Sequence, residues 1–287
     1  MQIALIARRD GRLSGFLRGE MGISAGLMNK LKWQERFLVN GVPVHTDFPV
    51  RQGDRILAIL DEPEPKYPAE DGQLRILYED ENFLAVDKEP GILIHPSQSR
   101  DTGTLANYVA GYYRRTGQAS AFHPVTRLDR DTYGVVLLAK NAHIHAKMNG
   151  LHDAGMLQKT YHALVYGCWS EDRGIIDAPI GRKPLPSLLR EIREDGKPSQ
   201  TGFQVLERRE NMTRLALRPI TGRTHQLRLH CAYMGHPILG DPQYGTEQSG
   251  ALSASLGLTH QLLCAKRICF TDPITGEERV IESQMDA

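Results

Sequence analysis

The sequence has few cysteines and no long hydrophobic run. Its 287 residues include four cysteines, none of them in a C-x-x-C pair, which excludes a zinc knuckle and a thioredoxin-like motif. No stretch of about 18 apolar residues is present, so we expect no membrane-spanning helix and no membrane partner. The first residues lack the charged start, apolar stretch and cleavage site of a signal peptide. We therefore expect a cytoplasmic protein whose cysteines are buried, reduced thiols.

An excess of charge of one sign is also missing. The chain holds 35 Lys and Arg against 34 Asp and Glu, a formal net charge of +1 at pH 7. This balance excludes a globally basic nucleic-acid coat but allows a local basic surface. The small basic excess lies near the start, because residues 1–60 hold nine Lys and Arg and five Asp and Glu. The hydrophobic share of 40% is enough for a packed core.

An acidic, proline-rich stretch divides the chain. Residues 61–72 contain three prolines and five acidic residues against one lysine. Such a segment buries little apolar area and its prolines stiffen it, so we predict a semi-rigid linker. It would separate an N-terminal domain at residues 1–60 from a larger domain at residues 73–287. We expect the protein to be a monomer.

The N-terminal domain has the pattern of two short helices followed by a small sheet. Apolar residues at helical spacing predict one helix over 13–17, and Ser24 can cap a second that runs to about Gln34. Asn40-Gly41 between two apolar runs predicts a hairpin turn, and residues 55–60 read as a strand. This layout resembles the S-four-like RNA-binding domain, which is named for a ribosomal protein.

Three basic residues lie at or after the end of the second helix. The resemblance implies that Lys30, Lys32 and Arg36 contact RNA phosphates, an interaction that depends on salt and not on base sequence. The alternative is a solvated basic helix face on a small packing domain.

The larger domain predicts an α+β fold with a mainly antiparallel sheet. No regular β-helix-β units occur in it and no repeat is found at periods of 20–50 residues. Apolar runs predict strands at 75–78, 83–86, 160–166, 202–206 and 212–217, and helices over 104–114 and after Asn141. We expect a loop at 246–256 and a mobile excursion at 183–199.

Two clusters of polar residues carry the candidate chemistry. The first is a charge-dense turn, residues 123–134, that leads directly into an apolar strand. Carboxylates beside a core must be paired or hydrogen-bonded, and on spacing alone Asp129-x-Asp131 is either a metal site or a pair of solvated carboxylates. The second, residues 221–230, opens a helix that Thr221 or Thr224 can cap.

In that helix Arg228 lies on the flank of the apolar face, so it can reach into a cleft. His225 and His230 lie on different helix faces, and no H-E-x-x-H motif is present, so we expect no metal site there.

The two clusters together resemble the RluA-like family of RNA pseudouridine synthases. Residues 127–134 read Arg-Leu-Asp-Arg-Asp-Thr-Tyr-Gly and residues 221–230 read Thr-Gly-Arg-Thr-His-Gln-Leu-Arg-Leu-His. The likeness runs from Val86 to about Glu277, or about two thirds of the chain. It implies the pseudouridine synthase fold and the isomerisation of specific uridines in structured RNA, ribosomal or transfer. It also implies that no cofactor and no metal are needed.

The resemblance assigns catalytic roles to three residues. Asp129 matches the catalytic carboxylate, the nucleophile in the usual account, and Arg228 matches its ion-pair partner. A cation beside a partly buried carboxylate keeps it ionised. Tyr161 matches the tyrosine that stacks on the target uracil, since a flipped base needs a flat platform.

The resemblance also implies substrate contacts. Leu263 matches the aliphatic residue beneath the base, and Arg127 matches the arginine that fills the space left by the displaced base. The remaining candidates come from the same motifs and are Thr132, Arg223, His225 and Gln226.

The sequence departs from the family pattern at three positions. Tyr133 stands where serine is usual, while Cys264 and Asp272 each stand where histidine is usual.

Two other functions fit parts of the sequence. One is a non-catalytic RNA-binding or ribosome-assembly protein, which the joint retention of Asp129, Tyr161 and Arg228 disfavours. The other is a metal-dependent transferase or nuclease built on Asp129-x-Asp131.

Overall fold

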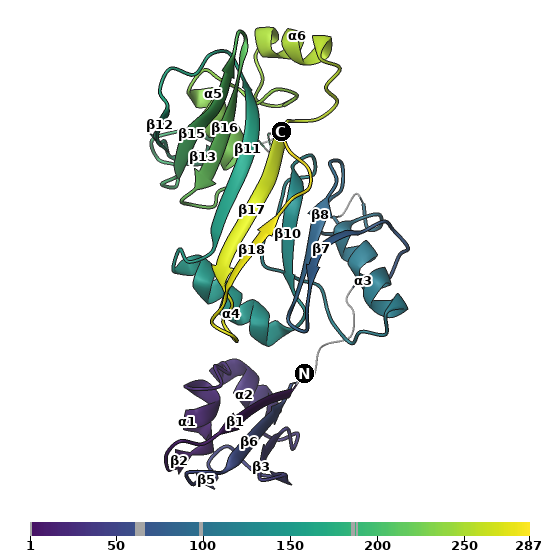
Figure 1. The fold of residues 1–287 in the computed structure, drawn as a ribbon, viewed down its shortest axis with the longest axis vertical. Helices are drawn as coiled ribbons and strands as arrows, with labels where there is room; N and C mark the ends of the chain where they lie inside the picture. Colours follow the sequence, from purple (N-terminus) through teal and green to yellow (C-terminus); the bar gives the residue numbers. More distant parts are fainter. Residues whose placement is uncertain (1, 61–66, 98–99, 185–186, 188) are drawn as a thin grey trace.

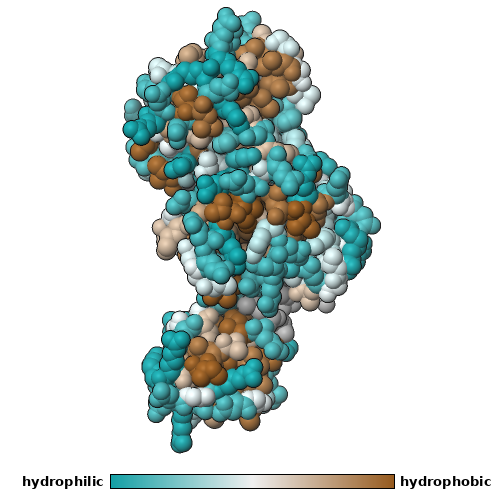
Figure 2. Space-filling view, viewed as in Figure 1, coloured by the Kyte–Doolittle hydropathy of each residue, from teal (hydrophilic) through white to brown (hydrophobic). Residues whose placement is uncertain are grey.

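The computed structural model describes residues 2–60, 67–97, 100–184, 187 and 189–287. Figure 1 shows a small N-terminal body, drawn in purple, and a larger body that carries one long curved sheet. In the face drawn in Figure 2 the N-terminal body is a separate lobe, and hydrophobic and hydrophilic side chains are mixed over the surface of both. The first half of the predicted linker, residues 61–66, lies outside the described residues.

The N-terminal body has its own sheet and core. Strands in the order β1-β6-β3-β4 form the sheet, and β2 pairs with β5. The elements are β1 (Gln2–Ile6), β2 (Gly11–Arg12), α1 (Leu13–Arg18), α2 (Ala25–Leu31), β3 (Phe37–Val39), β4 (Val42–Pro43), β5 (Pro49–Val50) and β6 (Arg55–Ile59). The buried apolar residues of this core all lie within residues 7–60.

Local signals explain most of these elements. The Ser24 hydroxyl accepts a hydrogen bond from the Leu27 backbone N–H at 3.2 Å and caps α2 as predicted, although α2 ends at Leu31 rather than Gln34. Asn40 and Gly41 have φ values of 51° and 83°, the conformation of the tight hairpin turn that this dipeptide favours.

The larger body is built on a ten-stranded sheet in the order β12-β15-β16-β11-β17-β10-β8-β7, with β18 beside β17 and β9 beside β10. Its strands are β7 (Arg75–Glu79), β8 (Phe83–Lys88), β9 (His123–Pro124), β10 (Tyr133–Ala139), β11 (Gln158–Tyr166), β12 (Arg173–Asp177), β15 (Gln200–Arg209), β16 (Met212–Pro219), β17 (Leu263–Thr271) and β18 (Glu278–Glu282). A separate hairpin pairs β13 (Ile180–Arg182) with β14 (Arg190–Ile192). The helices are α3 (Leu105–Arg115), α4 (Ala142–Asp153), α5 (Gln226–Tyr233) and α6 (Glu247–Ser255).

The predicted α+β class with a mainly antiparallel sheet is confirmed. In the part of the chain that the structure describes, β10 and β17 are the parallel pair of this sheet, and its other pairings are antiparallel.

Strand β10 is covered on both faces, which explains its unbroken apolar sequence. Val136 and Leu138 join the core cluster that contains α3, whereas Val135 and Leu137 join the cluster that contains α4. A strand buried on both sides loses the usual alternation of polar and apolar residues. Helix α5 packs over the other half of the sheet with residues of β11 and β16. The loop that precedes β10 is therefore anchored at its end to a strand that is buried on both faces near the middle of the sheet.

Two expectations for loops are revised. The prediction of a loop at 246–256 is wrong, because Glu247–Ser255 forms α6. Thr246 and Ser249 make a reciprocal capping box at its start, a signal that the weak apolar periodicity of the segment concealed. Within the predicted excursion at 183–199, Arg190–Ile192 forms a strand of the β13–β14 hairpin, while residues 185, 186 and 188 lie outside the described residues.

The second half of the predicted linker lies against α3. The Asn107 side chain donates to the Pro68 carbonyl at 3.0 Å, and Arg115 forms an ion pair with Asp71 at 2.6 Å. Residues 67–72 are thus packed onto the larger body.

Burial of the cysteines is only partly as predicted. Cys231 and Cys264 are buried free thiols, but Cys269 is half-buried and Cys168 is exposed. Among the described residues, no helix combines the length and the hydrophobicity needed to cross a bilayer.

Gly134 permits the close approach of β10 to β17. Its φ is +106°, and a Cβ atom there would lie 2.4 Å from the Ala265 carbonyl oxygen. We expect Gly134→Ala to lower the free energy of unfolding by at least about 2 kcal/mol, since strain and a backbone clash combine. Gly257→Ala is the matched control, because Gly257 has a φ of +66° but open space around it, and should cost only about 1 kcal/mol. Calorimetric unfolding measures both, and equal losses would contradict the clash.

Candidate active site

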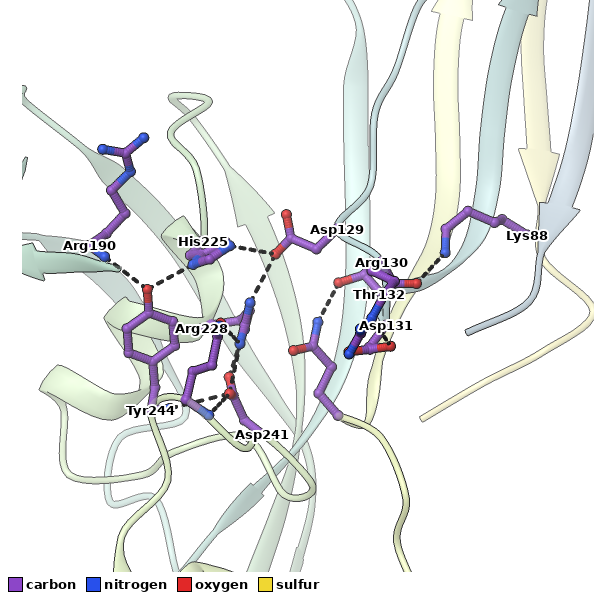
Figure 3. Close-up of polar contacts among 12 residues, drawn as sticks. Lys88, Asp129, Arg130, Asp131, Thr132, Arg190, His225, Arg228, Asp241 and Tyr244 are labelled. Carbon is purple, nitrogen blue, oxygen red and sulfur yellow. Dashed lines mark hydrogen bonds and ion pairs between the residues drawn. The ribbon is translucent and has the colours of Figure 1, made fainter. Parts of the chain in front are cut away.

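The loop between β9 and β10 carries Asp129 and is held by a buried lysine. Lys88, at the end of β8, is 1% exposed. Its ammonium donates to the carbonyls of Glu89 at 3.0 Å, Ile92 at 2.9 Å and Arg130 at 2.8 Å. Burial lowers the pKa of Lys88 to about 7, although the negative charges of Asp131 and Asp129 act to raise it. The Lys88–Arg130 contact ties the loop to the sheet (Figure 3).

Two further contacts involve residues 130–132 of this loop. The Thr132 hydroxyl accepts a hydrogen bond from the buried Gln261 amide at 2.5 Å. Arg130 donates two hydrogen bonds to Asp131, at 3.0 and 2.9 Å. These bonds are the largest cause that lowers the pKa of Asp131. The carboxylate of Asp131 is therefore turned to Arg130.

Arg228 lies between two carboxylates that the chain brings from different elements. It projects from α5 with 5% of its surface exposed. Its Nε and Nη2 each donate to Asp241 at 2.7 Å, and Nη2 also donates to Gln243 at 2.8 Å. The remaining nitrogen, Nη1, lies 3.3 Å from Asp129 Oδ2 (Figure 3). The Asp241 side chain is fully buried, whereas that of Asp129 is 32% exposed, so Asp129 is the carboxylate that a substrate can reach.

The turn before α5 differs from the predicted threonine cap. His225 occupies the N-cap position with a φ of 59°, in the left-handed region, and no side chain caps the helix. The Gln226 side chain instead braces the turn that precedes the helix: its Oε1 accepts from the Thr221 hydroxyl and the Arg223 N–H, at 2.8 and 3.0 Å. The expectation that Thr221 or Thr224 caps α5 is thus wrong, because Gln226 folds back over the turn.

This turn directs His225 toward Asp129. The ring Nε2 lies 3.8 Å from Asp129 Oδ2, and Nδ1 lies 2.7 Å from the Tyr244 hydroxyl. Burial is the largest cause that lowers the pKa of His225. The imidazole is therefore mainly neutral at pH 7.

Tyr161 lies on β11 at an irregularity in the sheet. The register between β11 and β17 shifts between Thr160 and His162, and such bulges redirect a side chain. Its ring packs against the core cluster that contains Leu263, a residue only 3% exposed. Burial, with a smaller contribution from the charge of Asp129, raises the pKa of the Tyr161 hydroxyl.

The other substrate-binding candidates fall into two groups. Arg127 and Arg223 are exposed; Arg223 donates to the Pro198 carbonyl at 3.3 Å, and Arg127 makes no hydrogen bond or ion pair within the described ranges. Thr132 and Gln226 are buried, and their polar groups are engaged by other residues of the protein.

The basic residues Lys30, Lys32 and Arg36 belong to the N-terminal body, where Lys30 is exposed and the other two are half-buried.

Sequence reasoning assigned no role to four residues of this site. They are Lys88, Asp241, Gln243 and Tyr244. The available signal was the run Asp241-Pro-Gln-Tyr-Gly245, which places a carboxylate and a phenol in a tight turn of the segment that follows the helix of Arg228.

Two of the three departures from the family pattern contact one segment near residue 285. The Tyr133 hydroxyl donates to the Asp286 carbonyl at 3.0 Å, and Cys264 Sγ lies 3.6 Å from the Met285 carbonyl. Asp272 instead accepts hydrogen bonds from backbone N–H groups of the following turn. Tyr133 is thus buried in the protein rather than exposed.

No group of three or more metal-ligating side chains is gathered in the described part of the chain.

Known proteins resemble this chain over the region that contains Asp129, Tyr161 and Arg228. A family model described as RNA pseudouridylate synthase matches residues 82–233. The chain is 36% identical to "Uncharacterized RNA pseudouridine synthase YjbO" of Bacillus subtilis over 90% of each chain. It is 30% identical to "Ribosomal large subunit pseudouridine synthase C" of Vibrio cholerae, over 96% of this chain and 90% of that one. A solved structure, "Human RNA Pseudouridylate Synthase Domain Containing 1", aligns with a TM-score of 0.63 and 27% identity over 76% of this chain and 86% of that one.

The Arg228–Asp241 pair predicts a large loss of stability when it is broken. Asp241→Asn would leave a buried guanidinium without its bidentate partner, so we expect the free energy of unfolding to fall by about 3 kcal/mol. Asp131→Asn is the control, since the Arg130–Asp131 pair lies nearer the surface and such pairs are worth at most about 1 kcal/mol. Urea unfolding followed by circular dichroism measures both. An Asp241→Asn protein as stable as wild type would contradict the interpretation.

Proposed function

The chain belongs to the RNA pseudouridylate synthase family and isomerises uridine in RNA to pseudouridine, and we propose that Asp129 is the carboxylate that carries this reaction. The observation that supports this role most directly is the contact at 3.3 Å between Asp129 Oδ2 and the buried Arg228 guanidinium. The guanidinium supplies this oxygen with a charged hydrogen-bond donor. The partial exposure of the Asp129 side chain leaves room for a nucleotide to approach.

The reaction needs a reactive carboxylate and a site that holds a free base. The bond between the uracil nitrogen and the ribose breaks, the uracil turns, and its carbon 5 joins the ribose. Carbon 5 gives up its proton to solvent and the freed nitrogen takes one up, so the product is an isomer of the substrate. Asp129 can attack the anomeric carbon of the ribose, attack carbon 6 of the uracil, or remove a proton from the sugar. Each of these steps requires an anion with an unshielded oxygen.

The residues around Asp129 suit a flat, extruded base. We assign Tyr161 to one face of the uracil and Leu263 to the surface beneath it, because both belong to one apolar cluster and the charge of Asp129 acts on the Tyr161 hydroxyl. We assign Arg127, which is exposed on the same loop as Asp129, to the space left by the displaced base. Arg223 and His225 flank the site at the start of α5.

Thr132 and Gln226 have a supporting role in this proposal. Their polar groups are engaged inside the protein, so they shape the Asp129 loop and the turn before α5 rather than contact the base.

Residues 1–60 supply a second RNA contact in this proposal. The exposed Lys30, with Lys32 and Arg36 nearby, gives α2 and the segment after it a positive charge suited to phosphates.

The substrate is a structured RNA, ribosomal or transfer, and the name of the Vibrio cholerae relative supports the ribosomal choice. Mapping pseudouridine in both RNA classes, in cells with and without the gene, distinguishes the two.

Asp129→Asn should abolish isomerisation while RNA binding survives, because the neutral amide keeps the shape of the side chain and loses its charge. Release of tritium from carbon 5 of labelled uridine in transcribed ribosomal RNA measures turnover, and filter binding measures affinity. Asp131→Asn is the matched control and should keep its activity, since this carboxylate is bound to Arg130. Normal turnover of Asp129→Asn would overturn the assignment, and loss of activity in both variants would favour a two-carboxylate metal site.

Replacing Lys30, Lys32 and Arg36 by Ala should weaken RNA binding and flatten its dependence on salt. Each lost phosphate contact reduces the slope of log affinity against log salt by about one. Filter binding from low to moderate salt measures the slope, and the rate with saturating RNA should stay at the wild-type value. An unchanged slope would remove the N-terminal body from the RNA-binding surface.

A further inference from the structure

Both protein donors at Asp129 face the same carboxylate oxygen. Arg228 Nη1 lies 3.3 Å and His225 Nε2 lies 3.8 Å from Oδ2. Within the described ranges, the other oxygen, Oδ1, has no hydrogen-bond or ion-pair partner. The two oxygens of this carboxylate are therefore not equivalent before any substrate arrives.

The Tyr244 hydroxyl is the group that contacts the Nδ1 side of the His225 ring. The Tyr244 hydroxyl accepts a hydrogen bond from the Arg190 backbone N–H at 3.1 Å and lies 2.7 Å from His225 Nδ1. A phenol has a single proton to donate, and burial raises the pKa of Tyr244, which keeps that proton in place. With the Arg190 N–H on one lone pair of the phenol oxygen, Nδ1 is the acceptor at hydrogen-bond distance from the Tyr244 proton. If the hydroxyl donates to Nδ1, the imidazole proton lies on Nε2, the nitrogen that faces Asp129.

The backbone at His225 is consistent with a constrained side chain. Its φ of 59° and ψ of 18° are left-handed, a conformation that costs free energy for a residue with a Cβ and that is concentrated at functional sites. The Tyr244 ring is also held, since the Arg228 guanidinium lies 4.9 Å from its centroid. The charged groups around the imidazole are Asp129, Arg228, Asp241 and Arg190.

We propose that Tyr244 and His225 are positioning residues for Asp129: Tyr244 sets the His225 tautomer, and the His225 Nε2–H, together with Arg228, holds Oδ2 so that Oδ1 is the oxygen presented to the uridine. This inference rests on the proposed role of Asp129. The separation of 3.8 Å between Nε2 and Oδ2 is longer than a hydrogen bond, and a movement of about 1 Å when RNA binds would close it. The β13–β14 hairpin takes part in this arrangement through the Arg190 N–H (Figure 3).

Three variants test the chain of contacts. Tyr244→Phe removes the tautomer-setting hydroxyl and should lower the single-turnover rate with saturating RNA about tenfold, the worth of one hydrogen bond, with unchanged RNA affinity. His225→Asn tolerates the left-handed backbone but is too short to reach Asp129, so its rate should fall at least as far. His225→Gln returns an N–H donor near the position of Nε2 and should recover part of the rate.

The double variant tests whether Tyr244 acts through His225. Glutamine does not have tautomers, so His225→Gln with Tyr244→Phe should turn over as fast as His225→Gln alone. Tyr112→Phe is the matched control: it also removes a hydroxyl bonded to a side chain, Glu79 at 2.5 Å, but lies outside this site, and should keep the wild-type rate. Tritium release from carbon 5 of uridine in transcribed ribosomal RNA measures all rates.

Separate outcomes overturn the inference and the proposed function. The positioning role is overturned if Tyr244→Phe and His225→Asn both keep the wild-type rate. It is also overturned if their losses of rate parallel losses of RNA affinity or of melting temperature, or if the losses of rate in the double variant are additive. If Asp129→Asn is inactive in the same assay while those variants match wild type, only this inference fails. If Asp129→Asn is itself fully active, the proposed role of Asp129 fails.

Discussion

The site depends on one guanidinium shared by two carboxylates. A buried arginine needs a partner that satisfies its charge and its planar donors, and Asp241 supplies this with two hydrogen bonds of 2.7 Å. Because Asp241 takes two nitrogens, the third can face Asp129 without being required for the stability of Arg228. The structure thus separates a structural ion pair, which is fully buried, from a weaker contact with a carboxylate that stays accessible.

The curved sheet brings these groups together. Asp129 precedes β10 and Arg228 lies on α5, 99 positions later, so neither element alone forms the site. The short parallel contact of β10 with β17 joins the half of the sheet covered by α3 and α4 to the half covered by α5. Tyr161, at the bulge between β11 and β17, lies where the halves meet. The geometry of the site is therefore set by strand pairing and by packing of large apolar surfaces.

Polar contacts then fix the Asp129 loop. Lys88 donates to three backbone carbonyls and Thr132 accepts from Gln261, so the loop is held by buried groups whose loss would leave unpaired donors or acceptors. The departures at Tyr133 and Cys264 both contact residues 285–286. Both side chains thus join β10 and β17 to this segment, and the catalytic candidates are retained.

Local sequence determined the elements whose signals act within a few residues: the Ser24 cap of α2, the Asn40-Gly41 turn and the apolar run of β10. The order of the two polar motifs was enough to identify the family, and their resemblance to it paired Asp129 with Arg228. Helix α6 was missed because its capping box lies in a segment with little apolar periodicity. The partner of the buried guanidinium, the left-handed His225 and the contact of its Nδ1 with Tyr244 were decided only by the tertiary structure. Each depends on atoms of Asp241, Gln226 or Tyr244 that folding places beside it, and spacing along the chain does not encode such contacts.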